Sequence, residues 1–167
     1  HFLVQQFIDG QTLAEELEAQ GKPFTEEQVR SLLLDLLPVL QFIHSHNVIH
    51  RDIKPDNIMR RQVDDRLVLI DFGAAKMATQ TELAKTGTTI GSAGYAAPEQ
   101  GYGKATFASD LYSLGVVCLN LLTQMHPFDL YDGMEGSFAW RDYLNNNSVS
   151  DPLATVLDKL THSSLKH

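Results

Sequence analysis

Apolar residues recur at helical spacing over residues 25–45, and this pattern predicts the longest helix of the chain. The recurring positions are Val29, Leu32, Leu33, Leu36, Leu37, Leu40 and Ile43. They lie three or four residues apart, as expected for one face of a helix. Thr25 and Gln28 have the spacing of a capping box, so the helix is expected to begin there. Pro38 should remove one backbone hydrogen bond and bend the helix without ending it.

Three further segments have readable patterns. Residues 108–123 are almost all apolar, which predicts a helix buried on every side, with Asp110 at its positive N-terminal end. Residues 12–18 predict a short helix that ends at the Gly-Lys-Pro sequence of residues 21–23. The Leu-Val-Leu-Ile run of residues 67–70 predicts a short strand.

Composition describes an ordinary globular chain. Its 167 residues are 43% hydrophobic and 20% charged, enough for one domain with a core. A net charge of −8 without any basic run argues against a nucleic-acid-binding surface, and we expect no membrane contact from this segment. Cys118 is the only cysteine, so no intrachain disulfide can form. We expect a cytoplasmic protein, and an anchor elsewhere in a longer parent chain stays open.

Most candidate catalytic and metal-binding residues lie in two short motifs. The first is His50-Arg51-Asp52-Ile53-Lys54-Pro55-Asp56-Asn57, and the second, Asp71-Phe72-Gly73, begins fourteen residues after Asn57. This spacing suits a hairpin whose two loops present Asp52 and Asn57 on one side and Asp71 on the other. Asn57 and Asp71 offer the hard oxygen ligands that Mg²⁺ prefers. Asp52 is left to orient an attacking hydroxyl, and Lys54 can reach the same acceptor and neutralise transferred charge.

Each of these residues alone is more often a turn residue that bonds its own backbone. Together they indicate phosphoryl transfer, and further motifs extend the pattern. Residues 91–99 read Gly-Ser-Ala-Gly-Tyr-Ala-Ala-Pro-Glu, residues 110–115 read Asp-Leu-Tyr-Ser-Leu-Gly, and residues 126–128 read His-Pro-Phe. In this order the motifs resemble those of the eukaryotic-type serine/threonine protein kinases. Lys54, two residues after Asp52, resembles the serine/threonine form rather than the tyrosine form, and the ending after Phe128 looks more like bacterial members.

The resemblance implies an α+β fold of the protein-kinase type. Its mainly helical C-terminal lobe would carry a small β-hairpin region with the catalytic and Asp-Phe-Gly loops. Residues 1–10 resemble the last strand of the N-terminal lobe and the hinge, and residues 11–167 resemble a C-terminal lobe that stops before its last helix. We therefore expect residues 1–167 to be a partial kinase domain. Without a Gly-rich loop and the N-lobe Lys, this piece alone should be inactive.

The resemblance also assigns roles in nucleotide binding. Backbone groups near Gln6 and Ile8 are expected to contact adenine, and Met59 to pack beneath it. A methionine is equally expected there as a plain core filler. Ser92 should bridge to Asp52 and Lys54, with an ordinary loop serine as the alternative reading.

Arg51 resembles the arginine of those kinases whose activation loop is ordered by a phosphate. The loop here is residues 73–92, and its threonines are Thr79, Thr81, Thr86, Thr88 and Thr89. We hypothesise that one of them is phosphorylated and contacts Arg51 and Lys76. An unmodified polar loop is the alternative.

His44, His46 and His50 cluster in the sequence, which raises the possibility of a zinc site. Such a site needs four converging ligands, and the lone cysteine lies far away in an apolar helix. By resemblance, His50 is expected to pack under Phe72. His44 and His46 are expected near a helix end, where partial positive charge is favourable.

The sequence thus predicts a transferase that moves the γ-phosphoryl group of ATP, with Mg²⁺, to a Ser or Thr hydroxyl of a protein substrate in phosphorylation signalling. Protein and nucleotide are the expected partners. One alternative is a catalytically incompetent scaffold or pseudokinase-like binding module. Another is a small-molecule phosphotransferase, against which the Pro98-Glu99 motif counts.

Overall fold

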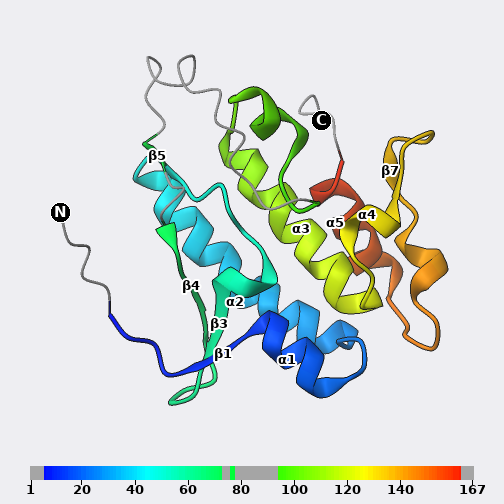
Figure 1. Cartoon of the computed structure of the whole chain (residues 1–167), viewed down its shortest axis with the longest axis horizontal. Coiled ribbons are helices and arrows are strands. Elements are labelled where there is room, and N and C mark those ends of the chain that lie inside the picture. The colour runs from blue at the N-terminus through cyan, green and yellow to red at the C-terminus, as the bar shows by residue number, and fades with distance from the viewer. Residues whose placement is uncertain (1–5, 73–75, 78–93, 163–167) are drawn as a thin grey trace.

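The computed structural model describes residues 6–72, 76–77 and 94–162. These residues form a mainly helical body with small antiparallel sheets, which confirms the predicted α+β class (Figure 1). The first described strand and the hairpin between the two sequence motifs lie at one end of the molecule. The helices α4 (Pro127–Leu130) and α5 (Asp151–Leu160) and the strand pair β6 (Tyr131–Asp132) and β7 (Ser137–Phe138) lie toward the other end.

The helix α2 (Glu26–Ser45) confirms the predicted long helix and its start. Thr25 caps it: the Gln28 backbone N–H donates to Thr25 Oγ1 over 3.3 Å, and the Thr25 N–H donates to Gln28 Oε1 over 2.8 Å. The helix continues past Pro38, as predicted. Leu37 was placed on the core face but is exposed, because it lies at the margin of the arc that the fully buried leucines define.

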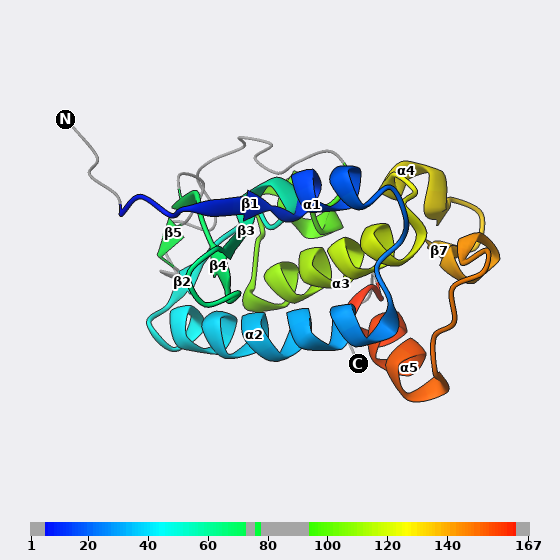
Figure 2. The ribbon, with the colours of Figure 1, turned by 90° about the horizontal axis from the view of Figure 1, so that it is seen from below.

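The helix α3 (Phe107–Thr123) is the centre of the molecule. Every residue from Ser109 to Thr123 is buried except Leu111, which confirms the predicted all-round burial. The helix α2 runs beside it, and α5 packs on it (Figure 2).

Burial raises the pKa of the Cys118 thiol, inside α3, to about 12. Among the described residues, no helix combines the length and apolar character needed to cross a membrane.

The loops that carry the two sequence motifs adjoin a three-stranded antiparallel sheet of order β1 (Gly10–Thr12), β3 (Ile58–Arg61) and β4 (Leu67–Leu69). In its register Gly10 pairs with Arg61, and Ile58 pairs with Leu69. The strand β4 confirms the strand expected at 67–70. Of the strand and hinge expected within residues 1–10, residues 1–5 lie outside the described residues, and residues 6–9 lead into β1 without forming a helix or a strand.

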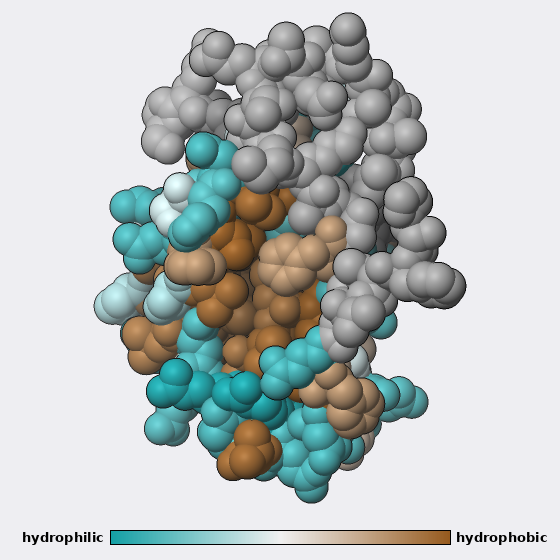
Figure 3. Space-filling view, turned by 90° about the vertical axis from the view of Figure 1, so that its left-hand side faces the viewer, coloured by the Kyte–Doolittle hydropathy of each residue, from teal (hydrophilic) through white to brown (hydrophobic). Residues whose placement is uncertain are grey.

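Shorter elements complete the framework. The strand β2 (Val48–Ile49) pairs with β5 (Lys76–Met77), and α1 (Leu13–Gln20) follows β1 directly, confirming the short helix predicted before Gly21. Short 3₁₀ helices span Pro55–Asn57, Pro98–Tyr102 and Trp140–Tyr143. From the side that carries the β3–β4 hairpin, the surface is hollowed and apolar at its centre and hydrophilic below (Figure 3). Exposed apolar surface of this kind is available to a ligand or a neighbouring segment.

The contact between α3 and α5 is close enough to test. A methyl group on Gly115 would lie 2.8 Å from Leu160 Cβ and 2.9 Å from Thr161 Cγ2. We therefore expect Gly115→Ala to lower the free energy of unfolding by about 1–3 kcal/mol through overpacking, measured by chemical denaturation. Gly101→Ala is the matched control, because a methyl group there meets no atom within 4 Å. Equal stability of the two variants would contradict this packing.

Candidate active site

A buried carboxylate positions the loop that carries the first motif. Asp110, in the first turn of α3, is fully buried. Its Oδ2 accepts the backbone N–H of His50 and its Oδ1 accepts that of Arg51, each over 2.9 Å. His44 Nε2 lies 2.8 Å from Oδ2. Since a buried carboxylate must be hydrogen-bonded, its position and that of the loop are fixed together.

Arg51 is held in a conformation that non-glycine residues seldom adopt. Its φ is 71°, in the left-handed region, which costs on the order of 1–3 kcal/mol. Asp110 fixes its N–H, and the Nε2 of the buried Gln100 donates to its carbonyl oxygen over 2.8 Å. Both peptide groups of Arg51 are therefore held by buried side chains that belong to other elements.

Asp52, Lys54 and Asn57, predicted from the first motif, lie close together. Asn57 Nδ2 donates to the carbonyl oxygen of Asp52 over 2.8 Å and to its Oδ2 over 3.0 Å. Lys54 Nζ lies 4.0 Å from the same Oδ2. Asn57 is buried, whereas the side chains of Asp52 and Lys54 are partly open to solvent. The loop thus presents a fixed carboxylate with a cation beside it.

The second motif reaches this loop through the β3–β4 pairing. Because Ile58 pairs with Leu69, Asn57 lies opposite Ile70, and the Ile70 N–H donates to the Asn57 carbonyl oxygen over 2.9 Å. Asp71 follows directly, with a φ of 59° that turns the chain out of the strand. The hairpin predicted from the spacing is therefore present, and it brings Asp71 to the end that carries Asn57.

His50 lies beneath the second motif as predicted. Its ring contacts Phe72 edge-on, with ring centroids 4.7 Å apart. Burial lowers the pKa of His50, although the Ile70 carbonyl and nearby carboxylates act in the opposite direction. A neutral ring fits its contacts: Nε2 donates to the Ile70 carbonyl oxygen over 3.0 Å, and Nδ1 accepts the Asp52 N–H over 3.3 Å.

The three histidines of the sequence cluster have separate partners. His44 contacts Asp110, His50 contacts Ile70, and His46 Nδ1 lies 2.8 Å from the Phe42 carbonyl oxygen. Within the described ranges, no group of three or more His, Cys, Asp or Glu residues is arranged to hold a metal ion.

The residues assigned to nucleotide binding lie near the sheet. Gln6 and Ile8 precede β1, with Gln6 exposed and Ile8 half-buried. Met59 is half-buried in β3 and faces Val68 across the β3–β4 pair. Ser92 and the five threonines of residues 73–92 lie outside the described residues.

Sequence reasoning missed two residues that the structure ties to the loop, namely His44 and Gln100. His44 was expected only to favour a helix end, and Gln100 was not singled out. The signal available for Gln100 was its place directly after the Ala-Pro-Glu sequence. The sequence alone does not indicate that Gln100 bonds the Arg51 carbonyl oxygen, because the two residues are far apart in the chain.

The anchoring role of Asp110 can be measured directly. In Asp110→Asn, one of the two accepting oxygens becomes an amide nitrogen, so one buried backbone N–H of the loop loses its acceptor. We expect the free energy of unfolding to fall by about 1–3 kcal/mol, with faster hydrogen exchange at His50 or Arg51. Asp129→Asn, at an exposed position of α4, is the control and should change neither quantity. Unchanged exchange in Asp110→Asn would contradict the anchoring.

Comparison with known proteins extends these findings over the whole chain. Residues 1–165 match the family model of the protein kinase domain. The chain is 41% identical to serine/threonine-protein kinase B of Synechocystis sp., over 99% of this chain and 30% of that protein. It is 46% identical to serine/threonine-protein kinase F of the same organism, over 95% of this chain and 32% of that protein. It is 42% identical to serine/threonine-protein kinase PknA of Nostoc sp., over 95% of this chain and 28% of that protein.

The chain spans about a third of the length of these relatives. The match to the family model nevertheless includes both motifs and Asp110, and all three relatives are bacterial. On this evidence the chain belongs to the protein kinase family and is similar to its bacterial serine/threonine members.

Proposed function

We propose that this chain is part of an ATP-dependent serine/threonine protein kinase that transfers the γ-phosphoryl group to a hydroxyl of a protein substrate. The observation that carries the proposal is the contact of Asn57 Nδ2 with Asp52 Oδ2, beside Lys54, on a loop paired to the strand that leads into Asp71. The similarity to serine/threonine-protein kinases over at least 95% of the chain supports a protein acceptor rather than a small molecule.

In this mechanism Asp52 orients the acceptor hydroxyl and accepts its proton. Its carboxylate is ready for this role because Asn57 fixes one oxygen and the loop fixes its backbone. Lys54, 4.0 Å from that oxygen, places positive charge where the transferred group carries negative charge. The chain thus supplies positioning and electrostatics, which account for most of the catalysis of phosphoryl transfer.

The donor set fits Mg²⁺. Asn57 uses Nδ2 for both of its contacts with Asp52, which leaves Oδ1 as a hard oxygen ligand. The Asp71 carboxylate at the neighbouring strand end would be the second ligand. Mg²⁺ held by these two residues would neutralise negative charge on the phosphoryl group during transfer.

For ATP itself, we assign the adenine contacts to the backbone near Gln6 and Ile8 and to the Met59 side chain. Met59 and Val68 face the same side of the β3–β4 pair and are both half-buried, which supports an apolar surface for a base. The bridging role of Ser92 and the division into residues 1–10 and 11–167 stay predictions.

Arg51 supports the hypothesis of a phosphorylated threonine. Its side chain is buried, and its Nε has no hydrogen-bond acceptor among the described residues. A buried guanidinium without a full set of acceptors is suited to an incoming phosphate. Mass spectrometry of the active protein that finds residues 73–92 entirely unmodified would exclude this regulation.

The function is tested by Asp52→Asn in the protein that contains this chain. We expect transfer of labelled phosphate from Mg·ATP to a generic Ser/Thr protein to fall by about 10²–10⁴-fold, because the general base is lost. ATP binding should be retained. Asp56→Asn is the matched control, because Asp56 lies on the same loop but is exposed and should leave transfer unchanged. Full activity in Asp52→Asn, or none in the unaltered protein, would contradict the proposal.

A further inference from the structure

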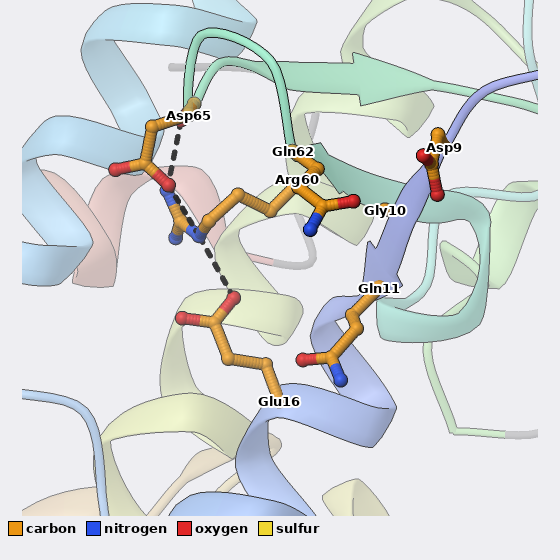
Figure 4. A pocket seen from close by; sticks show the side chains of 7 residues that line it. All are labelled: Asp9, Gly10, Gln11, Glu16, Arg60, Gln62 and Asp65. Atoms are coloured by element: carbon orange, nitrogen blue, oxygen red, sulfur yellow. Dashed lines mark hydrogen bonds and ion pairs between the residues drawn. The ribbon is translucent and has the colours of Figure 1, made fainter.

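One face of the β1–β3 pair is open and polar. Gln62 donates its N–H to the Asp9 carbonyl oxygen over 2.9 Å, and Gln11 pairs with Arg60 in the register. Side chains directly opposite each other in an antiparallel pair lie on the same face. Asp9, Gln11, Arg60 and Gln62 therefore share one face of the sheet, and Figure 4 shows them around a common hollow.

This hollow belongs to a longer groove. Its central cavity has a volume of about 600 Å³ and also includes Glu16 of α1 and Asp65 of the β3–β4 turn. A second cavity of about 410 Å³ shares Asp9 and the neighbouring Gln62 with the first and continues past Phe7 and Val63. A third, also of about 410 Å³, shares Glu16 and Asp65 and reaches Glu27 at the start of α2. The three form one path across the sheet face.

The groove carries an excess of negative charge. Its carboxylates are Asp9, Glu16, Glu27 and Asp65. Arg60 Nε on its floor lies 2.9 Å from Glu16 Oε2 and 3.9 Å from Asp65 Oδ1 (Figure 4). Asp9 and Glu27 have no side-chain hydrogen bond or ion pair within the described part of the chain. One unpaired carboxylate therefore lies toward each end.

One end of the groove adds apolar surface. Phe7 is 85% exposed and Val63 is 83% exposed, and both line the second cavity. Large apolar side chains this exposed, beside the unpaired carboxylate of Asp9, are suited to a ligand that has both apolar and basic groups.

We propose that this groove binds an extended peptide segment in which Lys or Arg residues stand beside an apolar residue. The basic side chains would pair with Asp9, Glu27 and Asp65, and the apolar one would contact Phe7 and Val63. An extended segment suits the elongated path, and charge complementarity favours fast association. Only the naming of this peptide as part of a protein substrate rests on the proposed kinase function.

The centre of the groove and the Met59 side chain of the proposed nucleotide surface lie on opposite faces of β3, whereas Gln6 and Ile8, which we assign to adenine, also line the second cavity. Successive strand residues point to opposite sides, so Arg60 faces the groove while Met59 faces the other side. A peptide held in the groove would leave the catalytic loop open to a distant acceptor residue of the same protein. Tethering of this kind raises the effective concentration of the acceptor.

The test uses a fluorescently labelled peptide with three arginines and a leucine. Its binding is measured by fluorescence anisotropy at low and at high salt. The groove variant Asp9→Asn/Glu27→Gln/Asp65→Asn should weaken binding about tenfold. The control Asp129→Asn/Glu135→Gln/Asp142→Asn removes the same charge from exposed positions of α4, the β6–β7 turn and the 3₁₀ helix Trp140–Tyr143. It should bind as the unaltered protein does. Binding should weaken at high salt.

Equal binding by the groove variant and the unaltered protein would overturn the inference, as would equal weakening in the control. Loss of a sedimentation dimer in the groove variant, without peptide binding in the unaltered protein, would assign the groove to a second copy instead. The assay needs no phosphoryl transfer, and Asp52→Asn should bind the peptide normally. A protein that binds peptide in the groove but transfers no phosphate would therefore refute the proposed function alone.

Discussion

The bonds from the Asp110 carboxylate to two backbone N–H groups are the constraint on which the site depends. The helix α3 cannot shift, because it is buried on nearly every side. Asp110, in the first turn of this helix, is therefore held in a fixed position. The loop with Asp52 is bonded to that point, and the hairpin that leads to Asp71 is bonded to the loop through Asn57 and Ile70. The hydrophobic core thus fixes α3, α3 fixes the loop through Asp110, and the loop fixes the hairpin.

A second support comes from the far side of the loop. Left-handed backbone in an arginine persists only where the surroundings determine it fully. Here the 3₁₀ helix Pro98–Tyr102 supplies Gln100 for that purpose, and the same helix contacts α3 through Glu99, which accepts the Ser109 hydroxyl. The loop is therefore clamped between α3 and the segment after residues 91–97. A displacement of that segment would release part of the strain stored at Arg51.

Sequence patterns predicted the two long helices because the buried positions of each are close together in the sequence. In α2 the apolar residues recur at helical spacing, and in α3 they form an almost continuous run. The grouping of Asp52, Lys54 and Asn57 was readable because they share one loop. The position of β1 was not, since pairing with Ile58–Arg61 depends on a contact some fifty residues away in the chain. Leu37 illustrates a smaller limit: spacing identifies the helical face but not its width. Gln100 and His44 were missed because their partners are distant in sequence.

The alternation of side chains along β3 has a consequence for how such a protein can diverge. Within two consecutive residues, one side chain faces the half-buried surface beside Val68 and the next faces a solvent-open acidic floor. Substitutions at Arg60 and Gln62 can accumulate without altering the shape of the surface at Met59. Point mutations on the groove face could therefore change which peptide a related chain binds without changing the residues that carry out phosphoryl transfer. The two properties can evolve separately because their side chains lie on opposite faces of one strand.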